Sequence, residues 1–167
     1  GNLSQVSGTP KEVVDQLEVV LSKAVSSQMQ SDVPLGAFLS GGIDSSTIVA
    51  LMQSQSDSRV NTFTIGFNAK EYDEAKHARR VANHIGTNHF EMYVSERDAL
   101  DIIPNLPNIY DEPFADSSQI PTYLVSKFAK QEVTVALSGD AGDELFGGYN
   151  RYVFADKMFS KIMKGPI

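Results

Sequence analysis

The sequence predicts an α/β fold in which a parallel β-sheet carries helices on both faces. Apolar segments of strand length alternate with segments of helical periodicity along the chain. Two glycine-rich segments, LSGGIDSS at 39–46 and SGDAGDELFGGY at 138–149, each follow an apolar run. Right-handed crossovers between successive parallel strands would place the connecting helices on both faces of the sheet.

The residue pattern of the first half of the chain predicts a helix, a strand, a loop and a second helix, in that order. Residues 9–12 (TPKE) have capping-box spacing with Pro in the first turn, so a helix begins there and ends near residue 29. After a break at Pro34, residues 35–39 (LGAFL) have the composition of a short buried strand. The first glycine-rich loop follows, and residues 47–52 form the body of the next helix.

The remaining elements follow from the same signals. Each was assigned by alternation, helical periodicity, capping residues or Pro and Gly breaks. They are a strand at 59–67, a helix at 73–86 with Gly86 as its C-cap, a strand at 88–94, a helix that begins at the capping box 95–98 and is interrupted near Pro104 and Pro107, a loop at 111–117, a helix at 118–130, a strand at 132–137 and a closing amphipathic helix.

Composition limits the classes of function. The chain has 167 residues, of which 41% are hydrophobic, so it is large enough for a single domain with its own core. Its net charge of -7 disfavours non-specific binding to nucleic acid or to an anionic membrane. The chain has no Cys, and no apolar run reaches the roughly 18 residues of a membrane span. We therefore expect a cytoplasmic protein that binds a small ligand, with residues 1–8 as a linker or a remnant of cloning.

The first glycine-rich loop has the residues of an anion site. Ser40, Gly41 and Gly42 allow backbone N–H groups to approach an anion closely, and the start of the next helix adds unpaired N–H donors. Ser45 and Ser46 add hydroxyl donors. The loop lacks the Lys of a Walker A motif and the spacing of a dinucleotide fingerprint, so neither of these motifs explains it.

Carboxylates in both loops predict a divalent cation. Asp44 would repel a phosphate unless a cation lay between them, and carboxylate and phosphate oxygens are the usual ligands of Mg²⁺. The second loop supplies Asp140, Asp143 and Glu144. If both loops face one crevice, Asp44 and Asp143 could share the metal. The alternative is that each loop is only a strand-to-helix turn with solvated acids.

Three segments together resemble a known family. LSGGIDSS resembles the pyrophosphate loop of the N-type ATP pyrophosphatases. With DEPFADSSQIPTY at 111–123 and SGDAGDELFGGYNRY at 138–152, it resembles the synthetase domain of glutamine-hydrolysing asparagine synthetases. The resemblance implies an adenine nucleotide alpha hydrolase-like fold, with ATP and Mg²⁺ used to adenylate the aspartate side chain, release pyrophosphate and form an amide with ammonia.

The resemblance also assigns roles to residues of this chain. Asp44 and Asp143 would hold Mg²⁺, and Asp140 would be the base of the amination step, although the family commonly has the longer Glu there. Asp111 and Asp116 lie in the substrate-side segment, where a loop that only caps the following helix is the alternative. The nucleotide-binding residues implied are Leu39, Ser40, Gly41, Gly42, Asp44, Ser45, Ser46, Ile65, Ser138 and Gly139.

The resemblance covers only part of the family's architecture. Residues 9–167 would be a partial synthetase domain that lacks the C-terminal helices and the glutaminase domain supplying ammonia. A homodimer remains open, as do an inactive nucleotide-binding module, an amidotransferase for another carboxylic acid, and a pyrophosphatase-type enzyme that modifies a nucleotide or tRNA. His77, His84 and His89 do not have metal-ligand spacing and are predicted to be solvated or core residues.

Overall fold

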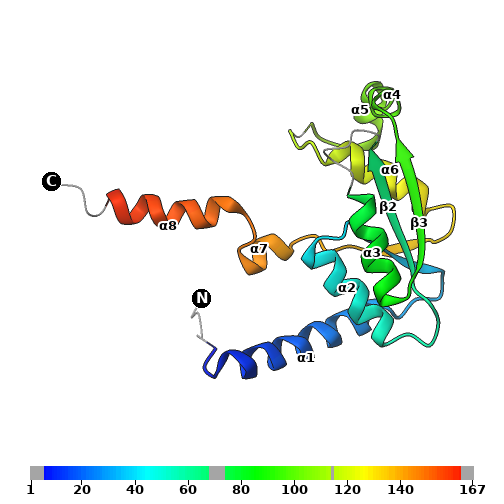
Figure 1. Ribbon diagram of the computed structural model, residues 1–167. Helices are drawn as coiled ribbons and strands as arrows, with labels where there is room; N and C mark the ends of the chain where they lie inside the picture. Colours follow the sequence, from blue (N-terminus) through cyan, green and yellow to red (C-terminus); the bar gives the residue numbers. More distant parts are fainter. Residues whose placement is uncertain (1–5, 68–73, 114, 163–167) are drawn as a thin grey trace.

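The computed structural model describes residues 6–67, 74–113 and 115–162. Within them, four parallel strands form one sheet in the order β3-β2-β1-β4 (Figure 1). The strands are β1 Leu35–Phe38, β2 Asn61–Phe67, β3 Asn88–Val94 and β4 Val135–Leu137. The predicted fold class is confirmed.

Helices connect the strands in the predicted order. The longer ones are α1 Pro10–Gln28, α2 Ile43–Ser54, α3 Ala75–Ile85, α6 Gln119–Ala129 and α8 Asn150–Ile162. The short ones are α4 Glu96–Leu100, η2 Ile103–Asn105, α5 Leu106–Ile109 and α7 Gly142–Phe146. The succession of α4, η2 and α5 agrees with the interruption predicted near the two prolines.

The capping residues lie where the sequence predicted them. Thr9 and Glu12 form a capping box at the start of α1, with Thr9 N–H donating to Glu12 Oε2 at 2.7 Å. Ser95 and Asp98 form another at α4, and the hydrogen bonds from Ser95 lower the pKa of Asp98. Gly86 ends α3 with φ +88°, a left-handed conformation that favours glycine.

The core has one layer on each face of the sheet. On one face, Ala37 of β1 packs in a cluster with Val25, Val49 and Ala78, which come from α1, α2 and α3. On the other face, Phe63 of β2 belongs to a cluster that includes side chains of α6. Helices therefore cover both faces, as alternating strands and helices require.

Aromatic contacts hold the α6 face together. The ring of Phe63 is fully buried and stacks on Phe90 of β3 at a centroid distance of 5.2 Å. Phe128 of α6 meets the same ring edge-on at 5.9 Å. Stacked and edge-on rings are both favourable arrangements, so these contacts tie α6 to the two strands.

The predicted boundaries need two corrections. The strand predicted at 132–137 is limited to β4, because the chain turns at residues 130–133 and enters the sheet only at Val135. The short helix α7 was not predicted, because five residues are too few to show the periodicity of apolar side chains that indicates a helix. Residues 1–5 of the predicted linker and Asp73, at the start of a predicted helix, lie outside the described residues.

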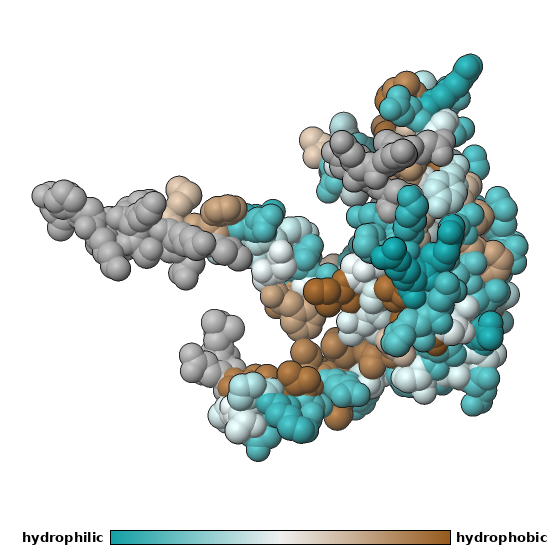
Figure 2. All heavy atoms as spheres, in the orientation of Figure 1, coloured by the Kyte–Doolittle hydropathy of each residue, from teal (hydrophilic) through white to brown (hydrophobic). Residues whose placement is uncertain are grey.

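Exposed apolar side chains gather on α1 and on α7 with α8. Figure 1 shows α7 and α8 projecting from the body of the molecule, and Figure 2 shows apolar residues along α1 on the side toward α8. Apolar surface of this extent is typical of an interaction surface. No helix of the described residues is long and apolar enough to cross a membrane. The exposed residues include Val14, Val19, Val20, Leu145, Phe146, Phe154, Met158 and Phe159.

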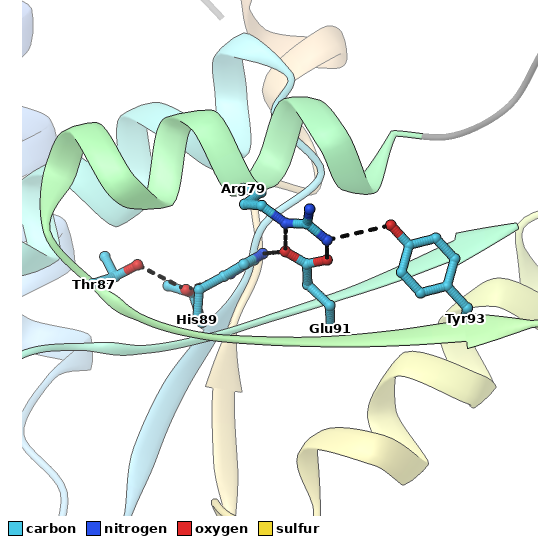
Figure 3. Close-up of polar contacts among 6 residues, drawn as sticks. Arg79, Thr87, His89, Glu91 and Tyr93 are labelled. Atoms are coloured by element: carbon cyan, nitrogen blue, oxygen red, sulfur yellow. Dashed lines mark hydrogen bonds and ion pairs between the residues drawn. The ribbon is translucent and has the colours of Figure 1, made fainter. Parts of the chain in front are cut away.

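A buried histidine links β2 to β3 (Figure 3). The side chain of His89 is 7% exposed, and its Nδ1 lies 2.9 Å from the hydroxyl of Thr62, which in turn lies 2.9 Å from that of Thr87. Its Nε2 lies 3.6 Å from Glu91 Oε1. Burial lowers the pKa of His89; Glu91 opposes this shift with a smaller effect and Arg79 adds to it. His89 is therefore a core residue, whereas His77 and His84 are exposed.

The lowered pKa of His89 predicts a loss of stability in mild acid. Unfolded His89 takes up a proton as the pH falls through about 6.5, whereas the folded imidazole takes one up only at a lower pH, so unfolding becomes more favourable as the pH falls below about 6.5. Thermal unfolding at pH 7.5 and 5.5 should show a larger fall in Tm for the natural chain than for His89→Asn, which cannot be protonated. Equal falls in Tm for the two proteins would contradict a buried neutral His89.

Candidate functional site

The two glycine-rich loops leave the sheet side by side. β1 pairs with β2 on one side and with β4 on the other, so the strand order reverses beside β1. Ala37 pairs with Leu137, which puts the carboxyl ends of β1 and β4 at the same level. In parallel α/β sheets, ligands bind in the crevice at such a switch point.

The first loop, residues 39–46, is held by its own serine hydroxyls. The hydroxyls of Ser40 and Ser45 lie 3.0 Å apart, and Ser45 Oγ accepts from Ser40 N–H at 3.3 Å. Gly42 N–H donates to Ser40 Oγ at 3.2 Å. Both hydroxyls thus fix the shape of the loop, in addition to any bond they make to a ligand.

The loop runs into the amino-terminal end of α2. Gly42 is the N-cap and no side chain caps the first turn, whose first internal backbone bond is Ser46 N–H to Gly42 O at 3.1 Å. The N–H groups of Ile43 and Asp44 precede that bond and have no partner within the helix. A 12-residue helix that begins in this way offers donors and a positive dipole end to an anion.

The second loop, residues 138–149, touches the first loop at backbone distance. A Cβ atom at position 139 would lie 2.6 Å from the backbone nitrogen of Ser45. A Cβ atom at position 142 would overlap the carboxyl group of Asp44. Only glycine allows these approaches, so the two loops face one crevice.

A cavity of about 540 Å³ occupies this crevice. The predicted residues that line it are Leu39, Ser40, Gly42, Asp44, Ser45, Ile65, Asp116, Ser138, Gly139, Asp140 and Asp143. Three predicted residues do not line it. Gly41 packs on the backbone of α3, Ser46 has a buried hydroxyl without a hydrogen-bond partner among the described residues, and Asp111 is exposed elsewhere.

The end of the cavity nearest the sheet is apolar. Leu39 is buried directly after β1, and Ile65 lies in β2, with Phe38 and Phe63 beside them in the lining. Leu39 N–H donates to Phe63 O at 2.9 Å, which continues the pairing of β1 and β2 beyond the strand. The part of the lining contributed by β1 and β2 is therefore largely apolar.

Three carboxylates of the cavity are held by nearby donors. Ser138 Oγ donates to Asp140 Oδ2 at 2.9 Å. The hydroxyl of Tyr149 donates to Glu144 Oε1 at 2.5 Å, which lowers the pKa of Glu144 and raises the pKa of Tyr149 to about 12. Bonds from Ser118 lower the pKa of Asp116. Glu144 and Asp116 are therefore ionised at neutral pH.

Asp44, Asp143 and Glu74 are the lining carboxylates without such donors. Among the described residues, none of the three makes a side-chain hydrogen bond or an ion pair; Asp44 and Asp143 belong to the two glycine-rich loops, whereas Glu74 lies at the start of α3. No group of three metal-ligating side chains is gathered within the described part of the chain. Two carboxylates suit Mg²⁺, which commonly takes one or two carboxylates and completes its shell with water and substrate phosphates.

The structure adds residues that the sequence did not single out. Glu74 at the start of α3, Thr122 of α6 and Tyr149 all line the cavity. Ala141, between Asp140 and α7, has φ +71°, a conformation unusual for a residue with a Cβ atom. A sequence pattern alone does not reveal the bond from Tyr149 to Glu144.

Comparison with known proteins identifies the family. The asparagine synthase family model matches residues 16–163. The chain belongs to the asparagine synthase family. It is 47% identical over 149 residues to a Methanocaldococcus jannaschii protein whose name places it among glutamine-hydrolysing asparagine synthetases, a match that covers 89% of this chain and 29% of the relative. It is 38% identical to asparagine synthetase (glutamine-hydrolysing) 1 of Bacillus subtilis. That match covers 98% of this chain and 26% of the relative.

Solved structures show the same fold at low sequence identity. NMN synthetase from Francisella tularensis superposes with a TM-score of 0.53 at 14% identity, covering 87% of this chain and 61% of that one. NH3-dependent NAD synthetase from Campylobacter jejuni superposes with a TM-score of 0.51 at 14% identity. The match covers 84% of this chain and 60% of that one. The chain therefore shares the fold of these two synthetases. The chain spans less than a third of the length of the two asparagine synthetase relatives.

The contact between the loops predicts an effect of Gly139→Ala on stability. The added methyl group would press on the backbone of Ser45, and overpacking of this kind costs about 1 to 3 kcal/mol. Denaturant unfolding should show this loss. Gly42→Ala is the comparison variant and should lose less stability, because a Cβ atom there would meet only the Ser40 hydroxyl, at 3.3 Å, and no backbone atom. Equal stability of the two variants would contradict the close approach of the loops.

Proposed function

We propose that this chain is the ATP-using part of an asparagine synthetase. The observation that carries the proposal is the meeting of two glycine-rich loops at the switch point, with Asp44 and Asp143 on the cavity between them. A carboxylate oxygen of aspartate attacks the α-phosphorus of ATP, and the bond to pyrophosphate breaks. Ammonia then attacks the acyl carbon, the bond to AMP breaks, and the amide forms.

Different residues of the cavity bind different parts of ATP in this proposal. The first loop and the start of α2 hold the pyrophosphate portion through backbone N–H groups. Leu39 and Ile65 flank adenine, and Ser138 and Gly139 contact the nucleotide near the reacting phosphorus. We assign Asp116, which lines the cavity, to the substrate side because its segment resembles the substrate-side loop of the family.

The charge of the cavity explains why a cation is needed. Its acidic lining residues are Asp44, Glu74, Asp116, Asp140, Asp143 and Glu144, and no Lys, Arg or His is among the described residues that line it. A triphosphate would be repelled from this lining in the absence of a counter-charge. Asp44 and Asp143 would hold Mg²⁺, which would supply that counter-charge to the phosphates.

Asp140 is the carboxylate that we assign to proton transfer. Attack by ammonia leaves excess protons on nitrogen, and one must pass to a base. Glu144 is already bound by Tyr149, and Asp143 is assigned to the metal. Asp140 is exposed at the cavity and is held only by Ser138, so it can accept a proton there.

The rest of the reaction depends on parts beyond this chain. We propose that residues 9–167 belong to a longer cytoplasmic enzyme in which a glutaminase domain supplies ammonia. The apolar surface of α1, α7 and α8 supports this, because contacts with a further part of such an enzyme would remove it from water. Self-association into a homodimer would bury the same kind of surface.

ATP–pyrophosphate exchange, measured across a set of carboxylic acids, tests whether aspartate is the acceptor.

Removal of the Asp44 charge should weaken binding of Mg-ATP. Asp44→Asn keeps the shape of the side chain but loses an anionic ligand, so we expect the Kd measured by calorimetry to rise about tenfold or more, which corresponds to about 1.4 kcal/mol. Asp101→Asn, at an exposed position after α4, is the matched control and should bind normally. Unchanged affinity in Asp44→Asn would remove Asp44 from the metal site.

Loss of Asp140 should separate the two half-reactions. In the complete synthetase, Asp140→Asn should retain aspartate-dependent pyrophosphate exchange, while amide formation falls by about 10² to 10⁴, the usual contribution of a general base. Asp140→Glu keeps the carboxylate one methylene further out and should keep or raise amide formation. An equal loss of exchange and amide in Asp140→Asn would place Asp140 among the nucleotide ligands.

A further inference from the structure

We propose that the first turn of α3 positions the pyrophosphate loop, and that Arg79, Glu91 and Tyr93 fix that turn on the sheet. We call these three residues the α3 clamp. The proposal rests on the proposed function, because it assumes that the first loop binds the pyrophosphate portion of ATP. It adds a set of positioning residues that lie outside the cavity and touch no part of the nucleotide.

The first loop rests directly on the backbone of α3. Gly41 has φ +84°, and a Cβ atom there would lie 2.8 Å from the backbone nitrogen of Ala78 and 2.9 Å from the carbonyl carbon of His77. Contact with main-chain atoms cannot be relieved by a change of rotamer. A shift of this turn of α3 toward the loop would therefore displace Gly41, and with it the N–H groups of the loop.

Arg79 is the next residue of α3 and is bound to the sheet (Figure 3). Its Nε donates to Glu91 Oε1 at 2.6 Å, and Nη2 donates to Glu91 Oε2 and to the hydroxyl of Tyr93 at 3.5 Å. The Glu91 side chain is 13% exposed, whereas that of Arg79 is 53% exposed. A two-point bond between a planar guanidinium and a largely buried carboxylate fixes orientation as well as distance.

The turn is also supported from the strands. A Cβ atom on Gly66 of β2 would lie 2.7 Å from the ring of Tyr93 and 3.0 Å from the Cβ atom of Ala75. The missing side chain at Gly66 thus leaves room for the Tyr93 ring and for Ala75, the first residue of α3. The first turn is held by the tyrosine ring and by the ion pair, while Gly41 packs against its backbone.

This arrangement predicts an effect confined to the phosphates. Leu39 and Ile65, which we assign to adenine, lie directly after β1 and in β2, and the pairing of these two strands involves no clamp residue. The first loop depends on α3 through Gly41. Weakening the clamp should therefore reduce affinity for pyrophosphate and leave affinity for the adenine portion almost unchanged.

Glu91→Gln tests the clamp, because it keeps the size of the side chain and removes its charge. Calorimetry with the full chain should show about tenfold weaker binding of Mg-pyrophosphate and Mg-ATP, while AMP binding stays within about twofold. Arg79→Lys, at an exposed position, keeps the positive charge but loses the second bond, and should show the same selective loss. Asp15→Asn, which breaks the exposed ion pair with Lys11, is the matched control and should change nothing.

The other possible results show whether the clamp or the proposed function is wrong. Wild-type affinity for Mg-pyrophosphate in both clamp variants would overturn the positioning role, and so would equal weakening of all three ligands, which indicates general loosening. If Glu91→Gln does not fold, Arg79→Lys alone decides the question in the same way. A natural chain that binds neither Mg-ATP nor Mg-pyrophosphate would overturn the proposed function instead of the clamp.

Discussion

The pairing of β1 with β4 is the constraint on which the site depends. Their register brings two strand ends to the same level, and the loops that follow must then share one narrow space. Glycine at position 139 lets the second loop lie against the backbone of Ser45, and glycine at 142 leaves room for the carboxyl group of Asp44. The backbone thus determines the cavity, and the acidic side chains are carried into it by the two loops.

This geometry also concentrates negative charge at a site that is to hold an anion. Acids from four parts of the chain face the cavity, and local donors hold Asp116, Asp140 and Glu144. For Asp116 and Glu144 these hydrogen bonds lower the pKa, so their repulsion of phosphate is not relieved by protonation near neutral pH. A bound cation is the simplest way to reconcile a carboxylate-lined cavity with a polyphosphate, and Asp44 and Asp143 have no competing hydrogen bond within the described residues.

The sequence predicted the elements better than their contacts. Capping boxes at Thr9 and Ser95 and the C-cap at Gly86 are local signals, and each lies where it was predicted. The order of the strands depends on tertiary packing, so alternation alone indicated a parallel sheet without placing β4 beside β1. A motif read along the chain also cannot distinguish Ser45, which lines the cavity, from Ser46, which does not. The left-handed Ala141 had no signal, because glycine is the usual residue there.

The two loops differ in how firmly the protein holds them. The first loop lies between α2, with buried Val49 and Met52, and the backbone of α3, so its shape is largely fixed without ligand. The second loop contains α7, which has no buried residue, and it approaches the first loop closely at Gly139 and Gly142. A cation bound by Asp44 and Asp143 would join the rigid loop to the less supported one. Metal binding would therefore complete the cavity as well as neutralise it, which is why the charge at Asp44 matters for both loops.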